Sequence, residues 1–214
     1  MIRKISEKIA EILVREQVIK VQDLELYVYG LELLLAESVC MVSVMGIGLL
    51  AGRFLHTVVY YLSYIVIRIY AGGYHADSHR SCTVIFSVCY LILMFFVEWT
   101  IFLNLTDIWL FGVVFADGVI LILAPVEDHR KPLKESEYQI FRKKVRKNLL
   151  LYSLTVIILY KSRVSVKCEI LYGMAAICEI AVLLLAGCVK NRYHSRQEHR
   201  KRVAEAEYDC GGSV

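Results

Sequence analysis

Residues 31–51, LELLLAESVCMVSVMGIGLLA, form a nearly uninterrupted apolar run. A hydrocarbon core about 30 Å thick takes roughly 20 helical residues to cross, so this run predicts a membrane-spanning helix. The composition agrees, because 57% of the 214 residues are hydrophobic, whereas an ordinary soluble domain has about 45–50% apolar residues. The sequence therefore predicts an integral membrane protein.

Five further apolar runs follow the first. They are residues 54–67, 83–105, 108–124, 148–160 and 170–189. The second and fifth of the six runs are short, so they would need snorkelling Arg and Lys side chains or a thinned bilayer, or would be re-entrant. In residues 1–29, Ile recurs at helical spacing among Lys and Glu, which predicts an amphipathic helix. The expected fold is all-α and polytopic, with about six transmembrane helices plus this N-terminal helix.

The Lys and Arg residues are unevenly distributed among the connecting segments. With the N-terminus in the cytosol, 21 of the 25 fall on the cytosolic side. The positive-inside rule then favours six spans with both termini cytosolic. Residues 1–190 would form a single helical membrane domain, and residues 191–214 a cytosolic, disordered tail. The first residues mix charge with apolar side chains, so no cleavable signal peptide is expected.

The segment RIYAGGYHADSHRSC, residues 68–82, is the densest polar stretch between two runs. Gly72 and Gly73 break the preceding helix and allow close backbone approach. Cys82 begins the next helix, where the helix dipole favours thiolate over thiol. A thiolate with a nearby imidazole, here His75, is the minimum equipment for acyl transfer. A cysteine packed at a membrane boundary beside a solvated histidine explains the pattern equally well.

A zinc site is the competing interpretation of the same segment. His75, His79 and Cys82 have i, i+4 and i+7 spacing, which would place three ligands on one helical face. The paired glycines argue against a regular helix there, and the sequence has no HExxH motif. Zinc is therefore the less favoured interpretation, and no cofactor is expected.

The segment resembles the signature of the accessory gene regulator protein B (AgrB) family, membrane cysteine endopeptidases of peptide quorum sensing. That signature holds an Arg, a Gly-Gly pair, a His and, seven residues later, a Cys, as in Arg68, Gly72–Gly73, His75 and Cys82. A second family motif follows the fourth run and ends in Lys-Pro, here within APVEDHRKPL, residues 124–133. The resemblance extends over nearly the whole chain in length and hydropathy.

The resemblance implies that Cys82 is the nucleophile and His75 the base of an endopeptidase. The substrate would be a short AgrD-like propeptide, cut on the N-terminal side of its acidic tail through a Cys82 thioester. An internal Cys or Ser of the peptide would then close a thiolactone or lactone ring. The resemblance also implies a homodimer in the bacterial cytoplasmic membrane. Its motifs give supporting roles to Arg68, Gly72, Gly73, Lys131 and Pro132.

Residues 126–147 are expected to form a loop, and they hold eight Lys and Arg residues. Such a loop attracts anionic lipid and sets topology, and it could also bind the acidic tail of the substrate. The residues expected to bind the tail are Arg142, Lys143, Lys144, Arg146 and Lys147. The expected partners are thus the propeptide and membrane lipids, and no nucleic acid.

Five acidic residues lie within or at the ends of the apolar runs: Glu32, Glu37, Glu98, Asp117 and Glu179. Acids inside a membrane are costly and often functional, so these could orient His75 or line a peptide path, or they could pair with another helix. They also suit the runner-up function, a small membrane transporter or exporter. The His–Cys segment at a helix start favours the enzyme, because a transporter would not need it.

Overall fold

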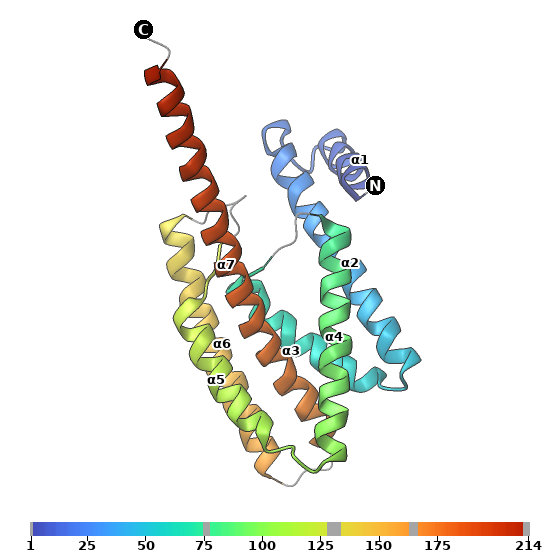
Figure 1. Ribbon diagram of the computed structural model, residues 1–214. Helices are drawn as coiled ribbons and strands as arrows, with labels where there is room; N and C mark the ends of the chain where they lie inside the picture. The colour runs from blue at the N-terminus through green and yellow to red at the C-terminus, as the bar shows by residue number, and fades with distance from the viewer. Residues whose placement is uncertain (1, 75–77, 128–133, 163–166, 212–214) are drawn as a thin grey trace. The chain divides into compact units, whose positions relative to one another are not determined.

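The computed structural model describes residues 2–74, 78–127, 134–162 and 167–211, and of residues 79, 198, 199 and 201–211 the backbone alone. These residues form an all-α protein, as predicted (Figure 1). In chain order the helices are α1 Ile2–Arg15, a 3-10 helix Val21–Asp23, α2 Leu24–Leu50, α3 Phe54–Ala71, α4 His79–Phe102, α5 Ile108–Leu123, α6 Glu135–Lys161 and α7 Lys167–Gly211.

All six predicted apolar runs lie in helices. Four of the described helices are long and apolar enough to cross a membrane, namely α2, α3, α4 and the first part of α7. Helix α5 is apolar but shorter, and α6 carries its apolar run in its second half. The two short runs belong to continuous helices, α3 and α6. The all-α, membrane-type fold is confirmed.

The N-terminal amphipathic helix is shorter than the predicted 1–29. Helix α1 ends at Arg15, because Gln17 adopts a left-handed conformation with φ 56°. The N–H of Val18 then bonds to the Leu13 carbonyl at 2.9 Å, and that of Gln17 to Val14 at 3.0 Å. This pair of bonds is the Schellman arrangement that ends a helix. No glycine marks the position, so no local pattern predicts the end of the helix there.

The predicted basic loop before the fifth run is largely helix. Helix α6 begins at Glu135, and the Glu137 carboxylate accepts the backbone N–H of Lys134 at 3.1 Å. Acidic residues in the first turn stabilise a helix N-terminus. The dense charge that suggested a loop therefore lies on the first half of α6, and the loop prediction is corrected for residues 135–147.

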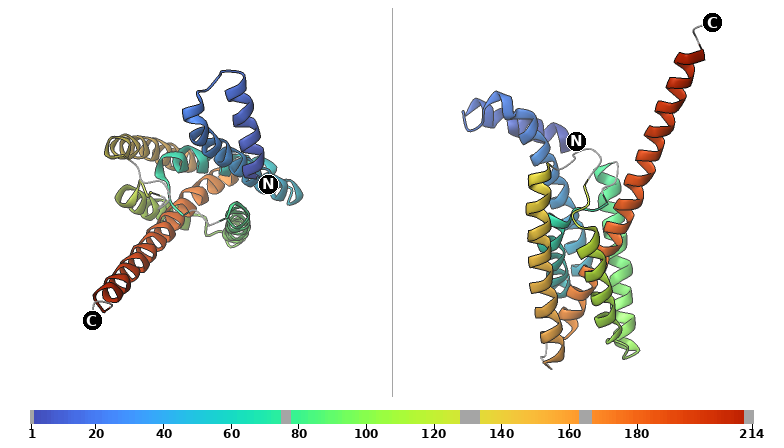
Figure 2. Two further views of the ribbon diagram at one scale, coloured as in Figure 1. Left: turned by 90° about the horizontal axis from the view of Figure 1, so that it is seen from above. Right: turned by 90° about the vertical axis from the view of Figure 1, so that its left-hand side faces the viewer.

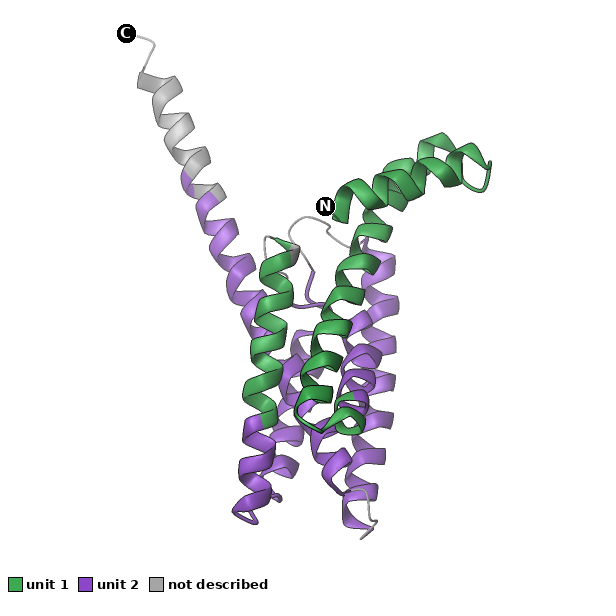
Figure 3. Cartoon of the chain, turned by 90° about the vertical axis from the view of Figure 1, so that its right-hand side faces the viewer, with its two compact units in different colours: residues 1–57, 76–94 green, residues 58–75, 95–214 purple. Residues whose placement is uncertain are grey.

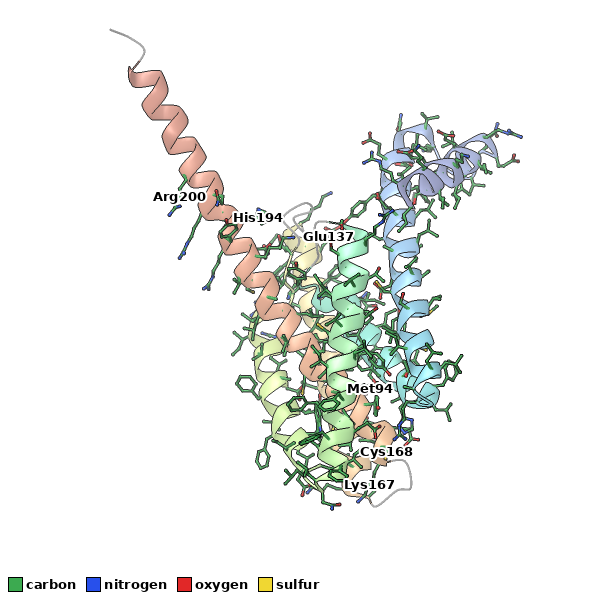
Figure 4. All side chains as sticks on the ribbon, turned by 45° about the vertical axis from the view of Figure 1, so that its right-hand side comes forward. Met94, Glu137, Lys167, Cys168, His194 and Arg200 are labelled. Carbon is green, nitrogen blue, oxygen red and sulfur yellow. The ribbon has the colours of Figure 1, made fainter. Side chains whose placement is uncertain are left out.

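The predicted disordered tail also differs from the structure. Helix α7 continues through residues 191–211 rather than ending at the membrane run. Between Gly187 and Gly211 the sequence has no glycine or proline, so nothing local breaks the helix. The Gln197 amide donates to Tyr193 Oη at 2.9 Å one turn earlier. Figure 4 shows His194 and Arg200 on this continuation and Lys167 and Cys168 at the other end of α7.

The chain divides into two compact units, coloured separately in Figure 3. Unit 1 comprises residues 1–57 and 76–94, and unit 2 comprises residues 58–75 and 95–214. In unit 1, α1 packs on α2. In unit 2, α5, α6 and α7 pack on one another (Figure 2). Helix α7 supplies much of the unit 2 core, including the fully buried side chains of Met174, Ile177 and Leu184.

Candidate functional site

Cys82 lies in the first turn of α4, as its place in the sequence predicts. Ser78 caps this turn: its Oγ accepts the backbone N–H of Ser81 at 3.1 Å, and its carbonyl oxygen accepts that of Cys82 at 3.0 Å. Cys82 is half-buried. Since a helix N-terminus stabilises negative charge, this position suits the thiolate that a nucleophile requires.

A second thiol lies beside Cys82 within unit 1. Cys40 of α2 is only 5% exposed, and the Cys82 side chain contributes to the electrostatic surroundings of its thiol. The Cys40 thiol also lies 3.4 Å from Thr83 Oγ1. Sequence reasoning gave Cys40 a packing role only. It missed this pairing because the two cysteines come from different helices and no local pattern relates them.

Arg68, near the end of α3, grips the backbone that follows the helix. Its guanidinium donates one hydrogen bond to the Gly72 carbonyl and another to the Tyr74 carbonyl at 2.6 Å. The planar guanidinium presents its donors in a fixed fork, so two bonds define the position of the gripped backbone. Residues 72–74 are called the clamped segment below. The predicted base, His75, is the next residue along the chain.

The clamped segment is also bonded to two other parts of unit 2. The Gly73 N–H donates to the carbonyl of Val126, which follows α5, at 3.1 Å. The Tyr74 N–H donates to the carbonyl of Leu183 in α7 at 2.9 Å. Backbone groups that are satisfied in this way hold a loop in one conformation. The segment before His75 is therefore fixed from three sides: by α3, by the α5–α6 connection and by α7.

The paired glycines are required by this arrangement. Gly72 and Gly73 have φ of 66° and 120°, which side-chain-bearing residues rarely adopt. A Cβ on Gly72 would collide with the Val126 carbonyl oxygen, and a Cβ on Gly73 would collide with the Arg68 guanidinium. The structure thus brings Arg68, Gly72 and Gly73 together and gives each a defined part in the clamp.

A third glycine completes the arrangement from α7. A Cβ on Gly187 would lie 2.8 Å from the Tyr74 backbone nitrogen and 2.9 Å from the Gly73 carbonyl carbon. Real Cβ atoms essentially never approach so closely. Gly187 therefore lets α7 pass directly against the clamped segment. Sequence reasoning missed it, because an isolated glycine in an apolar helix carries no signal of what it packs against.

The basic residues of α6 approach the same end of unit 2. The Lys144 Nζ lies 4.9 Å from the centre of the Tyr70 ring, and Phe141 packs edge-on against that ring. Tyr70 belongs to the last turn of α3, directly before the clamped segment. Lys143, Lys144, Arg146 and Lys147 are exposed, and Arg142 is half-buried. From α7, the Lys190 Nζ lies 5.3 Å from the Tyr74 ring.

Several predicted site residues fall outside the described residues. These are His75, Lys131 and Pro132, together with the side chain of His79 that the zinc interpretation requires. Cys82 belongs to unit 1, whereas Arg68 and the clamped segment belong to unit 2. The described geometry therefore consists of two parts: a capped helix start that bears the thiol, and a clamp that fixes the backbone leading to His75.

Comparison with known proteins agrees with the sequence signature. Residues 6–186 match the family model described as accessory gene regulator B. The chain is 27% identical over 192 residues to "Putative AgrB-like protein 2" of Clostridium perfringens strain 13, covering 83% of this chain and 90% of that protein. It is 33% identical over 147 residues to "Putative AgrB-like protein" of Listeria monocytogenes serovar 1/2a, covering 61% and 68%. A similarly named protein of Listeria innocua is 31% identical over 156 residues, covering 70% and 72%. No solved structure matches the chain.

Proposed function

The chain belongs to the accessory gene regulator B (AgrB) family, and we propose that it is a membrane cysteine endopeptidase that processes a quorum-sensing propeptide. The observation that carries the proposal is Cys82, half-buried in the capped first turn of α4. A second observation supports it: the Arg68 clamp holds the backbone immediately before His75. Both features fall on the residues of the family signature.

The proposed reaction begins with attack of the Cys82 thiolate on the scissile carbonyl of the propeptide. A C–S bond forms, the amide C–N bond breaks, and His75 transfers the thiol proton to the departing amine. The resulting thioester keeps the acyl group activated. An internal Cys or Ser of the peptide attacks it, giving its proton to His75 and releasing Cys82. The product is a cyclic thiolactone or lactone, formed without ATP.

The proposed substrate is an AgrD-like propeptide with an acidic C-terminal tail. The basic residues of α6 support this choice, because one of them packs on Tyr70 directly before the clamped segment. Opposite charges attract more strongly at a low-dielectric boundary than in bulk water. In the proposed topology, both chain termini and the start of α6 lie in the cytosol. Lys131 and Pro132 have a supporting role on the same, cytosolic side. The protein acts as a homodimer in the bacterial cytoplasmic membrane.

Cleavage by the purified protein in lipid nanodiscs tests the proposed function. Nanodiscs enclose no compartment, so an exporter would leave the propeptide intact, whereas the endopeptidase should cut it ahead of the acidic tail. Iodoacetamide should abolish cleavage and EDTA should leave it unchanged. Loss of activity with EDTA that added zinc restores would support the zinc interpretation. Transport of intact peptide into vesicles, with no cleavage in nanodiscs, would support the exporter.

Neutralising the charge on α6 should weaken substrate binding more than turnover. The test variant replaces Arg142, Lys143, Lys144, Arg146 and Lys147 by Gln. Each exposed ion pair contributes about 0.2–1 kcal/mol, so KM should rise about tenfold or more, while kcat changes less than about threefold. High salt should raise the KM of the unmodified enzyme in the same direction.

The matched control replaces three exposed basic residues of α1, Lys4, Lys8 and Arg15, by Gln. It removes positive charge elsewhere and should leave KM near the unmodified value. The assay uses zwitterionic lipid, with the propeptide tail either acidic or changed to amides. If the amide tail binds the unmodified enzyme as tightly as the acidic tail, the α6 charges act on lipid and topology alone.

A further inference from the structure

Helix α1 packs on α2 through a side that carries small residues. The fully covered residues of α1 are Ser6 and Ala10, whose short side chains let the two helices approach closely. Larger apolar side chains of α1 stay outside this contact, since Ile5 is 41% exposed and Ile12 57%. Burial of apolar surface is the main favourable term in folding and association, so these isoleucines require a partner other than α2.

The exposed isoleucines belong to a strip that runs along α1. Ile5, Ile9 and Ile12 follow at intervals of four and three residues, so they share one side of the helix; they are called the isoleucine strip below. Glu7 and Glu11 are also one turn apart, and the helical period of 3.6 residues places them on the opposite side. Helix α1 is therefore apolar along one side and acidic along the other, with α2 covering the side between them.

Exposed basic residues border the isoleucine strip. Lys8 is three residues from Ile5 and four from Ile12, so it lies beside both on the helix surface, and Lys4 precedes it by one turn. Both lysines are exposed. Lysine side chains next to an apolar strip can extend their ammonium groups to lipid headgroup phosphates while their stems cover apolar surface. Such contacts are to lipid rather than substrate, so neutralising these lysines should leave substrate binding unchanged.

The position of α1 relative to the membrane follows from α2, which belongs to the same unit. Helix α2 has 27 residues, or about 40 Å of helix, whereas a hydrocarbon core of about 30 Å takes only about 20 residues. The first turns of α2 therefore lie beyond the hydrocarbon when the rest of the helix spans it. Together with α1 they form a hairpin that lies across the rest of α2 (Figures 2 and 3). This arrangement places α1 along the bilayer surface.

The apolar surface continues from the hairpin onto the membrane-spanning part of α2. At the connection between the helices, Val18 and Val21 are 67% and 72% exposed, and Leu26 follows in the first turn of α2. Further along α2, Leu34 and Val42 are also exposed, as side chains that face lipid in a membrane span are. The exposed apolar residues of the hairpin thus adjoin a surface that already contacts lipid.

We propose that α1 is an in-plane membrane anchor whose partner is the phospholipid bilayer surface. The isoleucine strip inserts at the boundary between headgroups and acyl chains, the lysines lie at the level of the headgroup phosphates, and the acidic side faces water. Because α1 is packed on α2, the anchor fixes the depth of α2 in the membrane. The Cys40 thiol of α2 lies 3.4 Å from the Thr83 hydroxyl in the first turn of α4, so the anchor also holds the start of α4, with Cys82, near a constant depth.

Photocrosslinking from α1 in nanodiscs tests the proposal on the full-length protein. The photoreactive amino acid p-benzoylphenylalanine replaces Ile12 in the test variant, Ile5 in a second test variant and Glu11 in the matched control. All three positions are exposed, so a bulky side chain should be accommodated, and helicity is checked for each variant. After irradiation, mass spectrometry of α1 peptides identifies the attached molecule. Phospholipid adducts should form at Ile12 and Ile5 about fivefold or more above the level at Glu11, because an interfacial helix inserts only one side into lipid.

Equal lipid adducts at Ile12 and Glu11 would overturn the proposal, as would their absence from both Ile12 and Ile5. Crosslinks from Ile12 to a second copy of the chain, or to added propeptide, in place of lipid would assign the isoleucine strip to that partner and equally overturn it. The crosslinking needs no cleavage, so its result does not depend on the proposed function. A protein that fails to cut the propeptide would still report where α1 lies.

Discussion

Replacing Cys82 by Ala should abolish propeptide cleavage, to below about one thousandth of the unmodified rate, while leaving membrane insertion intact. The side chain removed is the only one proposed to bond covalently with the substrate. Cys82→Ser should be nearly as damaging, because a serine hydroxyl is not ionised at neutral pH. The measurement is product formation by mass spectrometry, with purified protein in nanodiscs.

The other cysteines provide controls for this result. Ala at Cys89, Cys178 or Cys188 should leave substantial activity, because these thiols lie within the helices and have no proposed chemical role. Cys40→Ala is the most stringent control, since the Cys40 thiol lies 3.4 Å from the hydroxyl of Thr83, the residue after Cys82. We expect it too to keep substantial activity. Cleavage that survives Cys82→Ala but not Cys40→Ala would move the nucleophile to the neighbouring helix.

Gly73→Ala should reduce kcat/KM about a hundredfold, because both the backbone and the space at this position exclude a methyl group. The φ of 120° is strained for alanine, and the new Cβ would collide with the Arg68 guanidinium. Relief of that collision requires the clamp to open, which frees the backbone before His75. The measurement is cleavage by variant protein of normal abundance and helicity in nanodiscs.

Gly118→Ala is the matched control for the Gly73 change. Gly118 lies within α5 of the same unit, and a Cβ added there would meet no atom within 4 Å. Alanine is the better helix former, so this change should leave activity unchanged or raise stability by about 1 kcal/mol. Full activity of Gly73→Ala would show that the clamp has no bearing on catalysis.

The fold follows from the sequence wherever a local pattern sets it. The apolar runs are helices, because the membrane leaves the backbone no other open arrangement for single segments. The sequence pattern predicts the end of the first helix too late, because Gln17 takes a left-handed conformation that glycine usually marks. The first half of α6 is predicted as a loop because dense basic charge resembles a solvated connection. Its N-terminal acids, among them Glu137, are the signal in the sequence that favours a helix start.

The candidate site was predictable only in part, for the same reason. The helix start at Cys82 and the bend at Gly72 and Gly73 are local features, and the sequence shows both. The residues that lie next to them in space, such as Cys40 and Gly187, come from distant parts of the chain. Glu179 is one of five candidate acids, and no local pattern predicts the hydrogen bond that it accepts from the Tyr60 hydroxyl of α3.

The central claim is that Cys82 forms a thioester with the propeptide, and intact-protein mass spectrometry tests it most directly. The substrate is an AgrD-like propeptide whose internal Cys is replaced by Ala, so that ring closure cannot discharge the intermediate, and the reaction is quenched in acid. The account predicts a mass increase equal to the N-terminal peptide fragment less one water, located on Cys82, released by hydroxylamine and absent from Cys82→Ala. Cleavage with Cys82 unmodified throughout, or an adduct on a different residue, would contradict it.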